Sequence, residues 1–118
     1  MTFSYIDRLQ ADQFSFIRIP KALLTENTFA ALSSQAKILY GIMVDKMDDS
    51  MRNKWQDDAG RVYIVYPVSE IQADLQLSRR KVIDCLAELE QIGLIERRKR
   101  GRGLPSILYV KNFAMSEG

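Results

Sequence analysis

The chain has 118 residues, of which 47% are hydrophobic and 27% are charged, a composition typical of one globular domain. It contains no histidine and a single cysteine, which excludes an intrachain disulfide, His-based metal sites, Ser-His triads and Cys-His dyads. No apolar run approaches the length of a membrane span, and residues 1–10 lack the basic region and apolar core of a signal peptide. We therefore expect a cytoplasmic protein that does not contact a membrane.

Residues 1–32 are predicted to form an N-terminal arm and a short helix. The loose alternation of residues 14–19 predicts a short strand that ends at Pro20, and residues 21–29 are expected to be helical. Two interpretations of the arm stay open, because its apolar residues can cover the domain core or form a dimerisation surface. The candidate dimerisation residues are Phe3, Tyr5, Phe14 and Phe16.

A longer helix is predicted from Ser33. Either Ser33 or Ser34 can accept a hydrogen bond from the free amides of the first turn. Apolar residues then recur at spacings of three and four, which predicts an inward stripe, and Asp48-Asp49-Ser50 is expected to end the helix.

The next segment is predicted to be a polar loop followed by a strand. Trp55 is the exception in the loop, and we expect it to pack against the core. The acidic residues here are interpreted as a solvated surface, because their spacing does not fit a calcium-binding loop. The β-branched and aromatic run 61–66 predicts a strand, which Pro67 closes.

A helix, a tight turn and a second helix are predicted next. Ser69 is the expected N-cap of a helix over 70–75, and Gln76-Leu77 forms the turn. Ser78 is expected to cap the second helix, which runs to about residue 91. Cys85 lies beside its apolar face and is interpreted as a packed, inert thiol. The inward residues are Val82, Ile83, Leu86, Leu89 and Ile92.

The net charge of +2 is unevenly distributed along the chain. Residues 1–78 hold 8 Lys/Arg against 10 Asp/Glu, whereas residues 79–118 hold 9 against 5. This asymmetry indicates a polyanionic partner. The cations of the second part form two clusters, Arg79, Arg80 and Lys81, and Arg97, Arg98, Lys99, Arg100 and Arg102.

The first cluster stands at the N-terminus of the second helix, where electrostatics normally favours acidic residues. This locally unfavourable choice indicates a functional demand. Duplex DNA supplies one, because recognition helices enter the major groove N-terminus first. Arg80 is then the candidate partner of guanine O6/N7 and Asp84 of cytosine N4. Arg79, Lys81 and the Ser78 hydroxyl suit phosphates. The alternative interpretation is a solvated helix face.

The second cluster is predicted to form the tip of a β-hairpin over residues 97–102. Gly93 is the expected left-handed C-cap of the preceding helix, residues 94–95 begin one strand, and residues 104–110 form the other. Five cations in six residues repel one another, and a phosphate backbone or a minor groove relieves that repulsion. The alternative is a loop that only aids solubility.

The predicted order is that of a winged helix-turn-helix in the α+β class. We expect this domain over residues 33–113, with the arm as an extra N-terminal element over residues 1–32. The chain has no G-x-x-x-x-G-K-[ST] or G-x-G-x-x-G motif, and no nucleophile–base pair stands out. We therefore expect no enzymatic activity, no cofactor and no metal.

Five stretches between about residues 14 and 113 carry a family resemblance. They are Phe16-Ile-Arg-Ile-Pro-Lys-Ala-Leu, Leu32-Ser-Ser-Gln-Ala-Lys-Ile-Leu-Tyr-Gly, Trp55-Gln-Asp-Asp-Ala-Gly-Arg-Val-Tyr-Ile, Gly93-Leu-Ile-Glu-Arg and Gly103-Leu-Pro-Ser. With them, the chain resembles the N-terminal domain of the RepA_N-type replication initiators of Gram-positive plasmids.

The resemblance implies a domain that binds repeats in double-stranded DNA at the plasmid origin, usually as a homodimer, and starts replication. It also implies a parent protein whose C-terminal domain recruits host replication proteins, with residues 114–118 as a tail toward that domain. Two alternatives remain at this point. One is a transcriptional regulator with the same fold, and the other is a winged helix used as a protein-interaction module.

Overall fold

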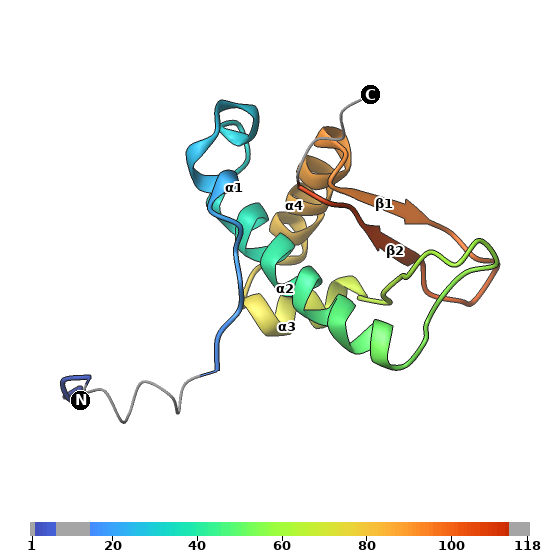
Figure 1. Cartoon of the computed structure of the whole chain (residues 1–118), viewed down its shortest axis with the longest axis horizontal. Helices are drawn as coiled ribbons and strands as arrows, with labels where there is room; N and C mark the ends of the chain where they lie inside the picture. Colours follow the sequence, from blue (N-terminus) through green and yellow to red (C-terminus); the bar gives the residue numbers. More distant parts are fainter. Residues whose placement is uncertain (1, 7–14, 114–118) are drawn as a thin grey trace.

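The computed structural model describes residues 2–6 and 15–113 of the chain. Three helices of two or more turns precede an antiparallel hairpin, which is the predicted order of a winged helix-turn-helix (Figure 1). In chain order the elements are α1 (Ala22–Thr25), the 3₁₀ helix η2 (Asn27–Phe29), α2 (Ser34–Arg52), α3 (Val68–Leu75), α4 (Arg79–Ile92), β1 (Ile95–Arg98) and β2 (Ile107–Val110).

One hydrophobic core joins these elements. Leu39 and Met43 of α2, Ile71 of α3 and Leu89 of α4 are fully buried in it, and both α2 and α3 pack against α4. Burying an aliphatic side chain of this size stabilises a fold by about 1.5–3 kcal/mol. The core therefore fixes α4, the candidate recognition helix, from two sides.

The N-terminal segment differs from its prediction. Residues 15–19 form no strand, and Phe14, predicted as a dimerisation residue, lies outside the described residues, as does the predicted tail 114–118. The expected single helix over 21–29 is divided at Glu26, which is extended with ψ 139°. The division has a packing reason. Leu23 and Phe29 are both buried, although six residues of one continuous α-helix would turn them roughly 240° apart.

Helix α2 begins as predicted and ends later. The Ser33 side chain accepts a hydrogen bond from the Ala36 N–H at 3.2 Å, which confirms the N-cap. The helix continues to Arg52, two residues beyond the predicted end. Its last turn is supported by an Arg52–Asp49 ion pair of 2.6 Å and by the Asn53 N–H, which donates to the Asp49 carbonyl.

The strand predicted over residues 61–66 is wrong. Only Ile64 joins the sheet, through one antiparallel bridge to Leu108. Residues 55–63 instead pair with one another as a separate hairpin, which we call the 55–63 hairpin, with a bridge between Gln56 and Val62. At its base, Trp55 is 45% exposed rather than packed in the core.

The wing is the β1–β2 hairpin, in which Ile95 pairs with Val110 and Arg98 with Ile107. Its second strand begins three residues later than predicted. Arg97 and Arg98 consequently belong to β1 rather than to the tip, and the loop that joins the strands is 99–106.

The helix-turn-helix is formed by α3, a two-residue turn and α4. Helix α3 starts one turn position earlier than predicted, because Pro67 rather than Ser69 is the N-cap, and its carbonyl accepts from the Glu70 and Ile71 amides. Gln76 ends α3 in the left-handed conformation (φ 54°), and Gly93 ends α4 in the same region (φ 88°), as predicted for the glycine.

Candidate nucleic-acid interface

The N-terminus of α4 is built by a local capping interaction. The Ser78 Oγ accepts a hydrogen bond from the Lys81 N–H at 3.1 Å, which confirms Ser78 as the N-cap. Its hydroxyl proton stays available to a phosphate oxygen, since a serine hydroxyl both donates and accepts. Arg79 and Lys81 have no ion-pair partner within residues 2–6 and 15–113.

The other two predicted reading residues face each other. The Arg80 Nε lies 3.4 Å from the Asp84 Oδ1, one turn away on the same exposed helix face. The Arg80 side chain is 85% exposed, so this pair is solvent-screened and contributes at most about 0.5 kcal/mol. Either side chain can leave the pair for a base edge at little cost.

The inward face of α4 is shifted by part of a turn from its prediction. Cys85 is fully buried, whereas Ile83, predicted to face inward, is 39% exposed. On a helix, residue 85 lies between the directions of Val82 and Leu89, which are both at 0% exposure and define the centre of the buried face. Burial raises the pKa of the Cys85 thiol, which favours the inert thiol that the sequence predicts.

A carboxylate that the sequence did not single out fixes the direction of α4. The two oxygens of Glu88 accept hydrogen bonds from the Ser33 N–H at 2.7 Å and from the Ser33 hydroxyl at 2.8 Å. Glu88 thus adds a second cap to the N-terminus of α2, where a negative charge is stabilised. This contact spans 55 residues of sequence, so no local pattern could have revealed it.

Most cations at the base of the wing are already paired. Arg97 contacts Glu90 of α4 at 3.0 Å, and Arg98 contacts Glu96 within β1 at 2.9 Å. These two arginines are therefore partly neutralised, in contrast to the prediction that all five cations of the cluster form one free tip.

The loop 99–106 carries the cations that remain available. The Arg100 Nε donates to the Pro105 carbonyl at 3.0 Å, which holds the loop closed and leaves the terminal guanidinium nitrogens outward. Lys99 and Arg102 have no ion-pair partner in the part of the chain that the structure describes. Gly101 has φ 112°, a conformation that favours glycine.

The 55–63 hairpin supports the wing from outside. Tyr109 lies on the sheet face opposite the core residue Leu108, yet it is only 6% exposed. Its hydroxyl donates to the Asp57 Oδ2 at 2.7 Å, and the Arg61 and Arg98 guanidinium carbons lie 5.0 and 5.2 Å from its ring centre. Figure 1 shows this hairpin extending to the same side of the molecule as the wing.

Asp57 is the centre of that contact. Besides the Tyr109 hydroxyl, it accepts from the Arg61 side chain and from the Ala59 and Arg61 amides, each at 2.9 Å. These interactions, the Tyr109 hydrogen bond first, lower the pKa of Asp57 to about 2. The carboxylate therefore stays ionised and keeps the hairpin attached to the wing across neutral pH.

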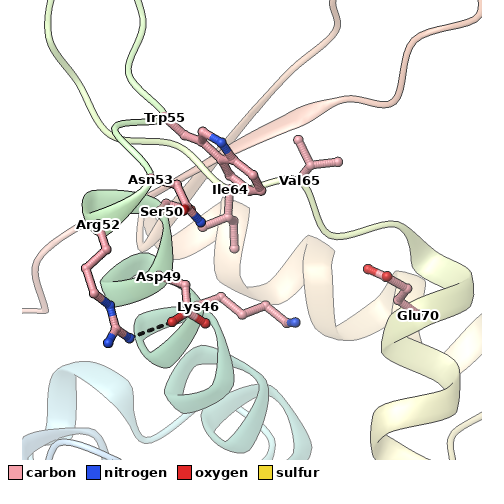
Figure 2. Close-up of a pocket in the computed structure, with 9 residues that line it drawn as sticks. All are labelled: Lys46, Asp49, Ser50, Arg52, Asn53, Trp55, Ile64, Val65 and Glu70. Carbon is pink, nitrogen blue, oxygen red and sulfur yellow. Dashed lines mark hydrogen bonds and ion pairs between the residues drawn. The ribbon is translucent and has the colours of Figure 1, made fainter.

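A pocket of about 480 Å³ opens at the end of α2 (Figure 2). The Trp55 indole forms one wall and Ile64 lies below it, while Lys46 and Glu70 place charges of opposite sign at the rim. None of the predicted DNA-binding residues lines it. Within the described residues, no three His, Cys, Asp or Glu side chains are arranged to hold a metal ion, and no helix is long and apolar enough to cross a membrane.

Comparison with known proteins places this arrangement in a family. Residues 15–118 match the family model described as the replication initiator protein A (RepA) N-terminus. The chain belongs to this family. The match covers the arm root, the helix-turn-helix and the wing, and it agrees with the resemblance that the sequence stretches carry.

Three similar proteins extend the comparison. The "N-Terminal domain of DNA binding protein" has a TM-score of 0.79 at 28% identity, and the alignment covers 98% of this chain and 88% of that one. The "Structure of Rep-DNA complex" has a TM-score of 0.79 at 29% identity, covering 97% and 88%. A "41 kDa protein" of Lactobacillus helveticus is 25% identical over 104 residues. This chain spans only 30% of that relative's length.

Proposed function

We propose that this chain is the sequence-specific, duplex-DNA-binding domain of a plasmid replication initiator, and that it binds repeats at the replication origin. The observation that supports this most is the placement of unpaired cations at both ends of one surface unit, at the start of α4 and in the loop of the wing. The membership in the initiator family and the similarity to a protein solved as a Rep–DNA complex favour the same function.

The two groups of cations have different roles in this proposal. Arg80 reads guanine and Asp84 reads cytosine in the major groove. Ser78, Arg79 and Lys81 hold phosphates beside them. The paired Arg80 and Asp84 side chains satisfy each other on DNA that lacks the matching bases, so they favour the specific site only where both are exchanged for base contacts.

The wing supplies contacts that do not depend on sequence. Lys99, Arg100 and Arg102 bind the phosphate backbone or enter a minor groove. Arg97 and Arg98 contribute less to binding than their charge suggests, because each already contacts a glutamate. We expect about four to six phosphate contacts per copy, which corresponds to a log–log salt slope of about −3.6 to −5.4.

The wider functions of the parent protein are also proposals. We propose that it acts in the cytoplasm, that it pairs as a homodimer through the aromatic arm, and that a separate C-terminal domain recruits host replication proteins. No catalytic step is proposed for this chain, because the initiator role assigned to it requires binding rather than bond cleavage.

Binding of fluorescent duplexes at several salt concentrations tests the proposal. One duplex carries the origin repeats, a second carries promoter DNA of the same replicon, and a third has a random sequence. Arg80→Ala should reduce the preference for the origin repeats by about 1–3 kcal/mol. Lys99→Ala combined with Arg102→Ala should weaken binding to all duplexes alike and make the salt slope less steep by about 2.

Arg52→Ala is the matched control, because Arg52 is equally exposed but lies at the far end of α2. The proposal is wrong if the Arg80 and wing variants retain both wild-type affinity and wild-type salt slope. A stronger preference for promoter DNA than for the origin repeats would instead support a transcriptional regulator.

A further inference from the structure

An apolar groove lies between α2 and the chain that follows β2. Its volume is about 330 Å³, which is at the lower end of the range for pockets that bind organic ligands. Val44, Met47 and Met51 of α2 form one wall, and Val110 and Phe113 form the other. None of the residues proposed to bind DNA lines this groove.

The groove follows one side of α2. Tyr40, Val44, Met47 and Met51 recur at spacings of four, three and four residues, so they share one helix face. Tyr40 is buried at the closed end, where its hydroxyl donates to the Lys111 carbonyl at 2.6 Å and joins the two walls. Met51 at the open end is 58% exposed. Flexible methionines along an open apolar surface adapt well to an inserted side chain.

The N-terminal arm carries apolar side chains of the kind that this groove fits. Phe3, Tyr5 and Ile6 are 84%, 99% and 70% exposed, so their own copy does not cover them. Such a run of exposed apolar residues is unfavourable in water and indicates a contact surface.

The root of the arm is fixed at the groove itself. Pro20 lines the groove, and Arg18 and Ile19 cross α2 at Gly41 (Figure 1). A β-carbon at Gly41 would lie 2.9 Å from the Ile19 Cγ1 and 3.0 Å from the Arg18 carbonyl oxygen. The glycine thus permits a close crossing that sets where the arm leaves the domain.

The arm is better suited to a second copy than to its own groove. Because the arm starts at the groove, residues 3–6 can return to it only if the chain reverses direction. Residues 1–19 contain no Gly, Pro or Asn, which are the residues that most favour such a turn. Extended, the 13 residues from 6 to 19 reach about 40 Å, which is comparable with the 49 × 34 × 31 Å dimensions of the molecule.

We propose that this groove binds Phe3 and Tyr5 of a second copy, and that the reciprocal exchange of arms forms a two-fold dimer. Two aromatic residues bury about 300–500 Å² per arm. Counted over both arms and both grooves, the exchange buries roughly 1,200–2,000 Å², the size of a stable interface. The proposal gives a receiving surface to the predicted dimerisation residues and does not depend on DNA being bound.

Sedimentation velocity over a range of protein concentrations, without DNA, measures the exchange. The wild-type chain should form a dimer. The double variant Phe3→Ser/Tyr5→Ser and the groove variant Met51→Glu should each weaken self-association at least tenfold. Leu104→Glu is the matched control, because Leu104 is 59% exposed in the wing, and it should leave the dimer unchanged. The inference is overturned if the wild-type chain stays monomeric up to about 1 mM, or if the control weakens the dimer as much as Met51→Glu does.

Disulfide trapping identifies the occupant. A Phe3→Cys chain mixed with a mass-tagged Met51→Cys chain should form a disulfide between chains of different mass, while the native Cys85 is fully buried and does not compete. In the double variant Phe3→Cys/Met51→Cys, a disulfide that forms only within single chains would show that each arm returns to its own groove, and this would refute the exchange.

Discussion

Removal of the Glu88 carboxylate tests how α4 is held in its direction. The side chain accepts two hydrogen bonds from Ser33, at 2.7 and 2.8 Å, in a partly buried position. A hydrogen bond to a charged group contributes about 1.5–3 kcal/mol, and a carboxylate at a helix N-terminus adds about 0.3–1 kcal/mol. Because the two bonds share one acceptor group and are not additive, we expect Glu88→Ala to lower the free energy of unfolding by about 2–4 kcal/mol.

Urea denaturation followed by circular dichroism measures this loss. With a slope of about 1.5 kcal/mol/M, a loss of 3 kcal/mol moves the midpoint by about 2 M. Glu90→Ala is the control, because Glu90 lies on the same helix but makes only a solvent-exposed ion pair with Arg97, worth about 0–1 kcal/mol. If the two variants unfold at the same urea concentration, the Ser33 contact does not hold α4 and the reasoning fails.

Three further predictions follow from single positions. The folded pKa of Asp57 is about 2, below the unfolded value of about 3.9, so its stabilisation is present above pH 4 and is lost as the pH falls toward 2. Asp57→Asn should therefore destabilise the chain at pH 5 and much less at pH 2.5, and an equal loss at both would refute this. Gly93→Ala should cost about 1–2 kcal/mol in urea, because φ is 88° although nothing lies within 4 Å of the added carbon; unchanged stability would contradict it. Gly41→Ala should displace the arm root and speed tryptic cleavage after Arg18; an unchanged rate would show that the crossing tolerates the methyl group.

The parts of the fold that the sequence predicted correctly depend on short-range signals. Ser33 and Ser78 cap helices through residues three positions later, and Gly93 ends α4 because its own φ is positive. Each of these interactions lies within one helical turn, so the order of nearby residues is enough to predict it.

The errors have physical causes that act over longer distances. The run 61–66 has the composition of a strand, but residues 55–63 pair with one another and leave Ile64 alone to bridge Leu108. The fixation of α4 by Glu88 and of the wing by Asp57 join residues more than 50 positions apart. Arg97 was predicted to be free, and its partner Glu90 lies on another element. Such contacts depend on tertiary packing, which periodicity does not encode.

The contact between Asp57 and Tyr109 has a mechanical consequence for the wing. The wing strands have the core on one face and the 55–63 hairpin on the other, so the lower half of the wing resists bending on both sides. Only the loop beyond Arg98 can change shape without breaking these contacts. A duplex bound as proposed therefore meets a stiff bracket with a pliant end, and differences in groove width along the DNA must be absorbed by bending of the duplex itself. Sequences that bend easily at that point would bind better, although no side chain of the wing reads their bases.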